Sequence, residues 1–149
     1  MRRYMKSLFT FLLLMCSIFV VAQEAYPVEN GAVLLDGYDP VSYFLGEAKK
    51  GNPNILIEID GRQLLFSSEE NKKTYEQSPE KFEPAYGGWC AIAMVDKTFV
   101  VPDYTLYKIQ DGALMFFSIR AFFNGLTEWD KDPDKNKLLA DTNYTVLFD

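Results

Sequence analysis

The alternation of apolar and polar residues predicts two β-hairpins along the chain. In the first, Ile55, Ile57 and Ile59 share one face of a strand. Both hairpins turn at an Asp-Gly dipeptide, which favours the tight turns that join antiparallel strands. The predicted pairs are residues 55–60 with 63–67 and residues 107–110 with 113–117, and a further strand is expected at 98–101.

Short helices are predicted between and after these hairpins. Prolines that directly follow a serine or an aspartate are typical of helix starts, since proline suits the first helical position and serine or aspartate caps it. Apolar residues at helical spacing, from Ile119 through Phe122 and Phe123 to Trp129, predict an amphipathic helix there. The expected helices are 41–44, 68–77, 79–83, 120–130 and 133–143.

This order of elements predicts a small α+β domain. Two hairpins packed with several short helices, and a C-terminal helical segment, account for residues 23–149. The sequence shows no internal repeat and no linker that would divide this domain. About 127 residues suffice for one hydrophobic core.

The first 22 residues have the three-part pattern of a secretory signal peptide. Arg2, Arg3 and Lys6 precede an apolar run, and Ala22 is a small residue suited to the cut. The run is shorter than the roughly 20 residues that a membrane-spanning helix needs. An alternative is a lipoprotein cut before Cys16. We expect export to the periplasm or the extracellular space, with no stable membrane span after cleavage.

Composition excludes several classes of function. The chain has 15 basic and 21 acidic residues, and loss of the leader would remove three of the basic ones. Such an acidic surface argues against nucleic acid as a partner. The sequence contains no histidine, which removes the usual general base and every histidine-ligated metal site. A hydrolase is therefore the weakest proposal, and we expect a protein that is not an enzyme.

The stretch 85–94 holds the one cysteine that remains after cleavage. If Gly88 caps a helix that starts at Trp89, Cys90 lies in the first turn, where the helix dipole favours a thiolate. Met94 would then follow one turn later on the same face. Thiolate and thioether are ligands suited to a soft ion such as Cu(I). The alternative is that Cys90 and Met94 are ordinary core residues.

The residues before Cys90 suggest a second kind of site. Tyr86, Gly87, Gly88 and Trp89 combine aromatic rings with unusual backbone, so they are candidates for a small-ligand pocket with an apolar wall. The alternative is that the two glycines form a tight turn that lets Trp89 enter the core.

A group of segments spread over the chain carries a family resemblance: 37–44, 66–71, 79–82, 84–91, 108–112, 122–124 and 140–144. Together they resemble exported bacterial proteins of the YHS-domain family. The resemblance covers nearly all of the mature chain and implies a small α+β domain. YHS modules linked to heavy-metal ATPases, and related TRASH modules, are associated with metal through cysteines, and the matching positions here are Ser42 and Ser67.

The resemblance therefore does not transfer that metal site. We expect an exported protein that binds a soft metal, most plausibly copper, through Cys90 and Met94. The alternatives are a structural, interaction or small-ligand-binding module with an inert buried cysteine, and a thiol redox sensor. A calcium-loop pattern between Asp130 and Asp141 is disfavoured, because it lacks the glycine that such a loop needs for its sharp turn.

Overall fold

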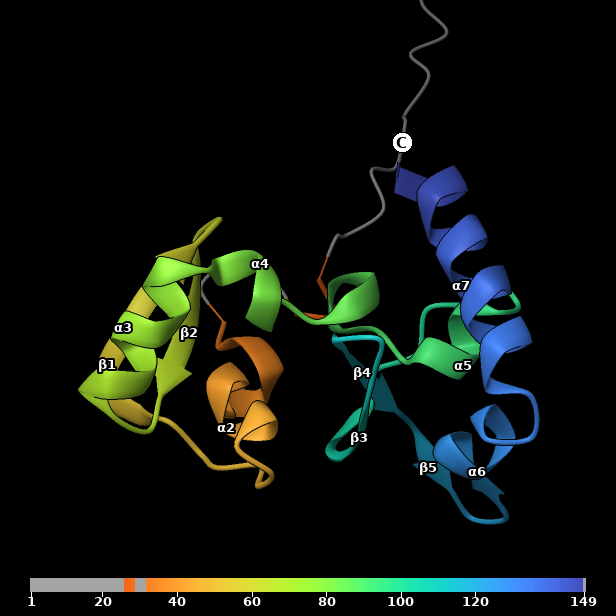
Figure 1. Ribbon diagram of the computed structural model, residues 1–149, viewed down its shortest axis with the longest axis horizontal. Coiled ribbons are helices and arrows are strands. Elements are labelled where there is room, and N and C mark those ends of the chain that lie inside the picture. The colour runs from red at the N-terminus through yellow and green to blue at the C-terminus, as the bar shows by residue number, and fades with distance from the viewer. Residues whose placement is uncertain (1–25, 29–31, 149) are drawn as a thin grey trace, which may run out of the picture.

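The computed structural model describes residues 26–28 and 32–148. It confirms the predicted α+β class: helices pack around small antiparallel strand pairs (Figure 1). The predicted signal peptide lies outside the described residues. In chain order the elements are η1 (Leu34–Gly37), α2 (Pro40–Phe44), β1 (Asn52–Ile59), β2 (Arg62–Phe66), α3 (Glu69–Gln77), α4 (Pro79–Phe82), η2 (Ala85–Gly88), α5 (Ala91–Met94), β3 (Asp103–Gln110), β4 (Ala113–Phe117), β5 (Ile119–Arg120), β6 (Phe123–Asn124), α6 (Gly125–Trp129) and α7 (Pro133–Phe148).

Both predicted hairpins form, and their pairings correspond residue by residue. In β1–β2, Asn52 pairs with Phe66 and a bulge follows before the pairing resumes at Leu56. In β3–β4, Asp103 pairs with Phe117 and the same bulge follows. Every partner in the second hairpin lies 51 positions after its counterpart in the first.

The same offset of 51 runs through the segments around the hairpins. The backbone N–H of Asp39 donates to the carbonyl of Lys49 at 2.8 Å, and that of Cys90 donates to the carbonyl of Val100 at 3.0 Å. Left-handed backbone recurs as well, at 35–37 and again at 86–88. Isolated parallel bridges repeat in the pairs Val33 with Gln63 and Pro84 with Leu114.

The expectation that the chain has no internal repeat is therefore wrong. Residues 33–67 and 84–118 build the same unit twice, which we call the first and the second half (Figure 1). The sequences hide this because only five aligned pairs are identical. These are Gly37/Gly88, Asp60/Asp111, Gly61/Gly112, Phe66/Phe117 and Ser67/Ser118.

A helix follows each half and packs one large aromatic ring on its hairpin. Tyr75 of α3 lies against Phe66, with ring centroids 5.4 Å apart. Trp129 of α6 lies against Phe117, the counterpart of Phe66, at 5.6 Å. The helices begin alike, since Ser68 and Asn124 each cap with a side-chain oxygen that accepts the backbone N–H three residues on.

The largest difference between the two repeats comes immediately after the serine that ends each half. The first half enters α3 at once, whereas Ser118 is followed by the short hairpin β5–β6 and only then by α6. The predicted helix 120–130 is therefore wrong over its first part. Phe122, placed by that pattern on an apolar helix face, is fully exposed at the hairpin turn. The periodicity failed because Phe122 and Phe123 belong to a hairpin rather than to a buried face.

Two other boundaries differ from expectation. No strand forms at residues 98–101, and β3 begins at Asp103. The last helix, α7, continues to Phe148 and lies along the second half, next to α5 (Figure 1). None of the helices in the described part of the chain has the length and apolar character needed to cross a membrane.

Candidate functional site

The first half is built around a buried carboxylate, that of Asp39. The side chain is fully buried. One oxygen, Oδ1, accepts the backbone N–H of Val41 at 2.9 Å, as a helix cap does. The other, Oδ2, accepts from the backbone N–H of Ser67 at 2.8 Å, from its hydroxyl at 2.6 Å and from the Asn71 amide at 2.6 Å. These four hydrogen bonds satisfy the carboxylate and tie α2, β2 and α3 together.

Ser42 completes this centre, which we call the Asp39 centre. Its hydroxyl donates to the carbonyl of Asp39 at 2.6 Å and accepts the backbone N–H of Lys49 at 2.9 Å. Ser42 and Ser67 are the positions that the resemblance noted from the sequence matched to metal-binding cysteines. Here both hydroxyls are engaged in hydrogen bonds within the chain, and these bonds hold the fold of the first half.

Cys90 occupies the corresponding position of the second half. It is fully buried, and its Sγ accepts the backbone N–H of Ser118 at 3.2 Å. The thiol donates to the hydroxyl oxygen of Ser118 at 3.4 Å. Cys90 is the N-cap of α5 and has extended backbone, so the predicted helix start at Trp89 is wrong. The helix begins at Ala91 and has only four residues.

Met94 follows Cys90 by one helical turn, as expected. Its backbone N–H donates to the carbonyl of Cys90 at 3.2 Å. The side chain is fully buried in a cluster that includes Met115, Phe117 and Trp129. Within residues 26–28 and 32–148, no three His, Cys, Asp or Glu side chains gather where they would hold a metal ion.

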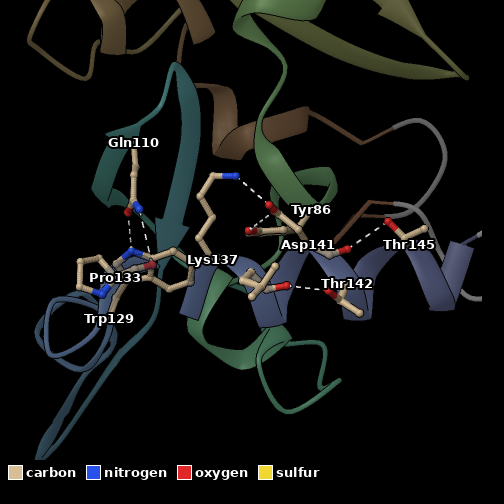
Figure 2. A network of polar contacts seen from close by, with 9 residues as sticks. Tyr86, Gln110, Trp129, Pro133, Lys137, Asp141, Thr142 and Thr145 are labelled. Carbon is tan, nitrogen blue, oxygen red and sulfur yellow. Dashed lines mark hydrogen bonds and ion pairs between the residues drawn. The ribbon is translucent and has the colours of Figure 1, made fainter. Parts of the chain in front are cut away.

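The candidates at 86–89 form the joint between the second half and α7. Tyr86, Gly87 and Gly88 all have left-handed backbone, with φ of 57°, 61° and 87°. The hydroxyl of Tyr86 donates to Oδ1 of Asp141 in α7 at 2.8 Å (Figure 2). Burial, and then this hydrogen bond, raise the pKa of Tyr86 well above its usual value. Trp89 packs edge-on against Phe99 with centroids 5.2 Å apart.

Two further contacts lie near this joint, one between α6 and β3 and one within α7 (Figure 2). Trp129 donates its indole N–H to the Gln110 side chain at 2.9 Å. Lys137 forms an ion pair with Oδ2 of Asp141 at 2.7 Å. A cavity of about 250 Å³ lies beside this joint, lined by Tyr86 and Gly87 together with Tyr26, Glu83, Pro84 and Tyr144.

A larger cleft, of about 600 Å³, opens beside α5, α6 and the β5–β6 hairpin. None of its lining residues was a favoured candidate from the sequence, because they come from segments far apart in the chain. Asp132 and Asn136 belong to the calcium-loop pattern that the sequence disfavoured. Its lining mixes apolar side chains with charges of both signs. The lining residues are Ile92, Ala93, Val95, Asp96, Thr98, Val100, Ser118, Arg120, Phe123, Glu128, Lys131, Asp132, Lys135 and Asn136.

Comparison of the two halves explains why this cleft is open. Ala93 and Val100 line it, and their counterparts in the first half are Ser42 and Lys49, whose hydrogen bond closes the Asp39 centre. Asn71, the third residue of α3, reaches into that centre, whereas Thr127 at the same place in α6 is exposed. The second half therefore lacks the polar groups that fill the first.

Charges in the cleft are only partly neutralised within the chain. Lys131 pairs with Glu128, and the Asp132 side chain caps α7 by accepting the backbone N–H of Lys135. Within the part of the chain that the structure describes, the Arg120 and Lys135 side chains form no ion pair. Asp96 is the one acid of the lining that has neither an ion pair nor a capping role among these residues.

Known proteins offer no guide to the role of this cleft. Comparisons of the chain with protein-family models, with curated proteins and with solved structures gave no significant match.

Proposed function

We propose that this chain is an exported, YHS-like, non-catalytic module that binds a small ligand in the cleft between α5, α6 and the β5–β6 hairpin. The observation that carries the proposal is the difference between the two halves. The same fold is filled by the hydrogen-bonded Asp39 centre in one half and opens a cleft of about 600 Å³ in the other.

The size and lining of the cleft support this proposal. Ligand sites in proteins are typically hollows of roughly 300–1,000 Å³ that combine apolar walls with a few polar groups. Ile92, Val95 and Phe123 supply apolar surface here, and Ser118 is a polar side chain that is only 7% exposed.

Binding without catalysis fits the chemistry of these residues better than turnover does. Ser118 is the one serine of the lining, and its hydroxyl oxygen accepts a hydrogen bond from the buried thiol of Cys90. A serine nucleophile needs an adjacent base, and the chain has no histidine to provide one.

In this proposal Cys90 is a structural residue. Full burial and two hydrogen bonds to Ser118 support an inert thiol that joins α5 to the strand end. Copper binding through Cys90 and Met94 stays a prediction. It would require these buried side chains to become accessible, and its test is given in the Discussion.

Ligand binding is tested by adding a panel of small-molecule fragments to the isotope-labelled protein and recording backbone amide NMR shifts. Binding fragments are expected to shift the amides of Thr98 and Ser118. Ala93→Trp, which fills the cleft, should abolish these shifts. Lys73→Trp, on the exposed face of α3, the helix that follows the first half, is the matched control and should leave them unchanged. Shifts that survive Ala93→Trp, or a panel without any binder, would contradict the proposal.

Export is tested separately, by the mass of the protein recovered from the periplasm and from the medium. We expect a product that has lost residues 1–22. A cytoplasmic product of full length would contradict export while leaving the cleft proposal untouched.

A further inference from the structure

We propose that the ligand of this cleft is a small organic monocarboxylate with an apolar body, an inference that rests on the ligand-binding function proposed above. Three independent features of the cleft support it: a buried hydroxyl whose one side-chain partner is a sulfur, cations without ion pairs, and apolar side chains beside them.

The hydroxyl is that of Ser118, and the first half shows what its position can hold. There the counterpart Ser67 donates its hydroxyl to the carboxylate of Asp39 at 2.6 Å. In the second half a thiol replaces that carboxylate, and this thiol donates to Ser118 instead. The one side-chain partner of the Ser118 hydroxyl among the described residues is therefore a sulfur, which is a weak hydrogen-bonding group. A ligand or water oxygen in the cleft would offer this hydroxyl a stronger acceptor.

The sign of the available charge favours an anion. Arg120 and Lys135 line the cleft without an ion pair among the described residues, whereas Lys131 is paired with Glu128. Arginine in particular presents a planar fork of N–H donors that matches a carboxylate. Asp96, which also lines the cleft, disfavours a ligand with a second negative charge.

The apolar part of the ligand follows from the rest of the lining. Ile92 and Val95 face the cleft from the α5 segment, and Phe123 lines it from the β5–β6 hairpin. Phe123 is 42% exposed, so a ligand would cover apolar surface that water now contacts. Each methylene of such a ligand that leaves water against this surface stabilises the complex. A short aliphatic or aryl chain attached to one carboxylate satisfies these groups together, whereas inorganic phosphate leaves the apolar surface uncovered.

The experiment is an NMR titration of the purified protein with four probes: hexanoate, hexanamide, leucine and inorganic phosphate. Hexanoate is expected to shift the cleft amides with the lowest Kd. Hexanamide, which has the same body without the charge, should bind about tenfold more weakly. Arg120→Gln combined with Lys135→Gln should weaken hexanoate about tenfold, and Ser118→Ala about fivefold. Lys73→Gln, which removes an exposed cation elsewhere, should change nothing.

Each result separates the ligand class from the site itself. Equal affinity for hexanoate and hexanamide, or full hexanoate binding to the double variant, would overturn the inference that the cleft recognises a carboxylate. Tighter binding of phosphate than of hexanoate would overturn the inference that the ligand has an apolar body. Tighter binding of leucine than of hexanoate would show that the ligand is an amino acid rather than a simple monocarboxylate. If fragments of other classes bind in the cleft while all four probes fail, the ligand class falls and the ligand-binding function stands. If nothing binds, both fall.

Discussion

Cys90 occupies in the second half of the fold the place that Asp39 occupies in the first. Each residue is fully buried, and each backbone N–H donates to a carbonyl ten residues further on. The side chain of each accepts the backbone N–H of a serine, Ser67 in the first half and Ser118 in the second. The same backbone frame thus holds a carboxylate once and a thiol once.

The Asp39 centre should be the most sensitive point of the first half. Asp39→Ala leaves four donors without their acceptor, so we expect the free energy of unfolding to fall by about 3–5 kcal/mol. Cys90→Ala removes a neutral group with weaker hydrogen bonds, and a loss of about 1–2 kcal/mol is expected. Urea unfolding followed by circular dichroism measures both.

Glu76→Ala serves as the control, because Glu76 is exposed on α3 and should stay within about 0.5 kcal/mol of the parent. A smaller loss for Asp39→Ala than for Cys90→Ala would contradict the role given to the carboxylate.

Burial of Cys90 predicts an unreactive thiol. Alkylation by iodoacetamide should be very slow in the native protein and fast in urea, since the thiol becomes accessible only on unfolding. Cu(I) titration against a competing chelator should give the same affinity for the parent and for Cys90→Ser if Cys90 is structural. Mass spectrometry and the absorbance of the chelator report the two outcomes.

A lower copper affinity of Cys90→Ser, together with rapid native alkylation, would restore Cys90 and Met94 as soft-metal ligands. Rapid alkylation alone, with copper affinity unchanged, would instead support the redox-sensor alternative.

Local patterns in the sequence predicted much of the fold. Asp-Gly turns with alternating flanks predicted both hairpins, because their chemistry is contained within a few residues. Asp39-Pro40 predicted the start of α2 for the same reason, and the structure shows the expected Asp39 cap. Cys90 was recognised as the centre of its segment, although its backbone is extended rather than helical.

Non-local features escaped prediction. The repeat leaves five identical pairs, and the signal in the sequence was one shared spacing of 51 positions. It separates Gly37 from Gly88, one Asp-Gly turn from the next, and Phe66-Ser67 from Phe117-Ser118. The cleft depends on Ala93 occupying the position that Ser42 occupies in the first half. This difference can be recognised only once the two halves have been aligned. At residues 119–124, apolar spacing favoured a helix. A hairpin forms instead, and Phe122, fully exposed, has no core to pack against.

Docking of α7 on the second half should depend on the hydrogen bond between Tyr86 and Asp141. A double-mutant cycle with Tyr86→Phe and Asp141→Asn is expected to give a coupling energy of about 1–2 kcal/mol, because the acceptor is charged and the hydroxyl is buried. Lys137→Gln, which removes the more exposed ion pair to the same carboxylate, should cost under about 1 kcal/mol. Additive single effects of Tyr86→Phe and Asp141→Asn would show that the contact in Figure 2 does not hold the helix.

Alkaline pH should destabilise the protein through its buried tyrosines, and Tyr75 offers the clearest test. Burial, together with the nearby charge of Glu83, raises the pKa of Tyr75 to about 12 from a usual value near 10. Between these two values the unfolded chain releases the phenolic proton while the folded chain keeps it. The folded state then binds more protons, so stability falls as pH rises. Below pH 10 both states are protonated, and this contribution is fully present.

Urea unfolding at pH 8, 10 and 11 should show a fall in the free energy of unfolding from pH 10 to 11 that is about 1 kcal/mol smaller in Tyr75→Phe than in the parent. The difference between the two proteins at pH 8 serves as the reference, since the variant also changes packing against Phe66. Parallel losses in both proteins above pH 10 would mean that Tyr75 ionises as readily when folded as when unfolded.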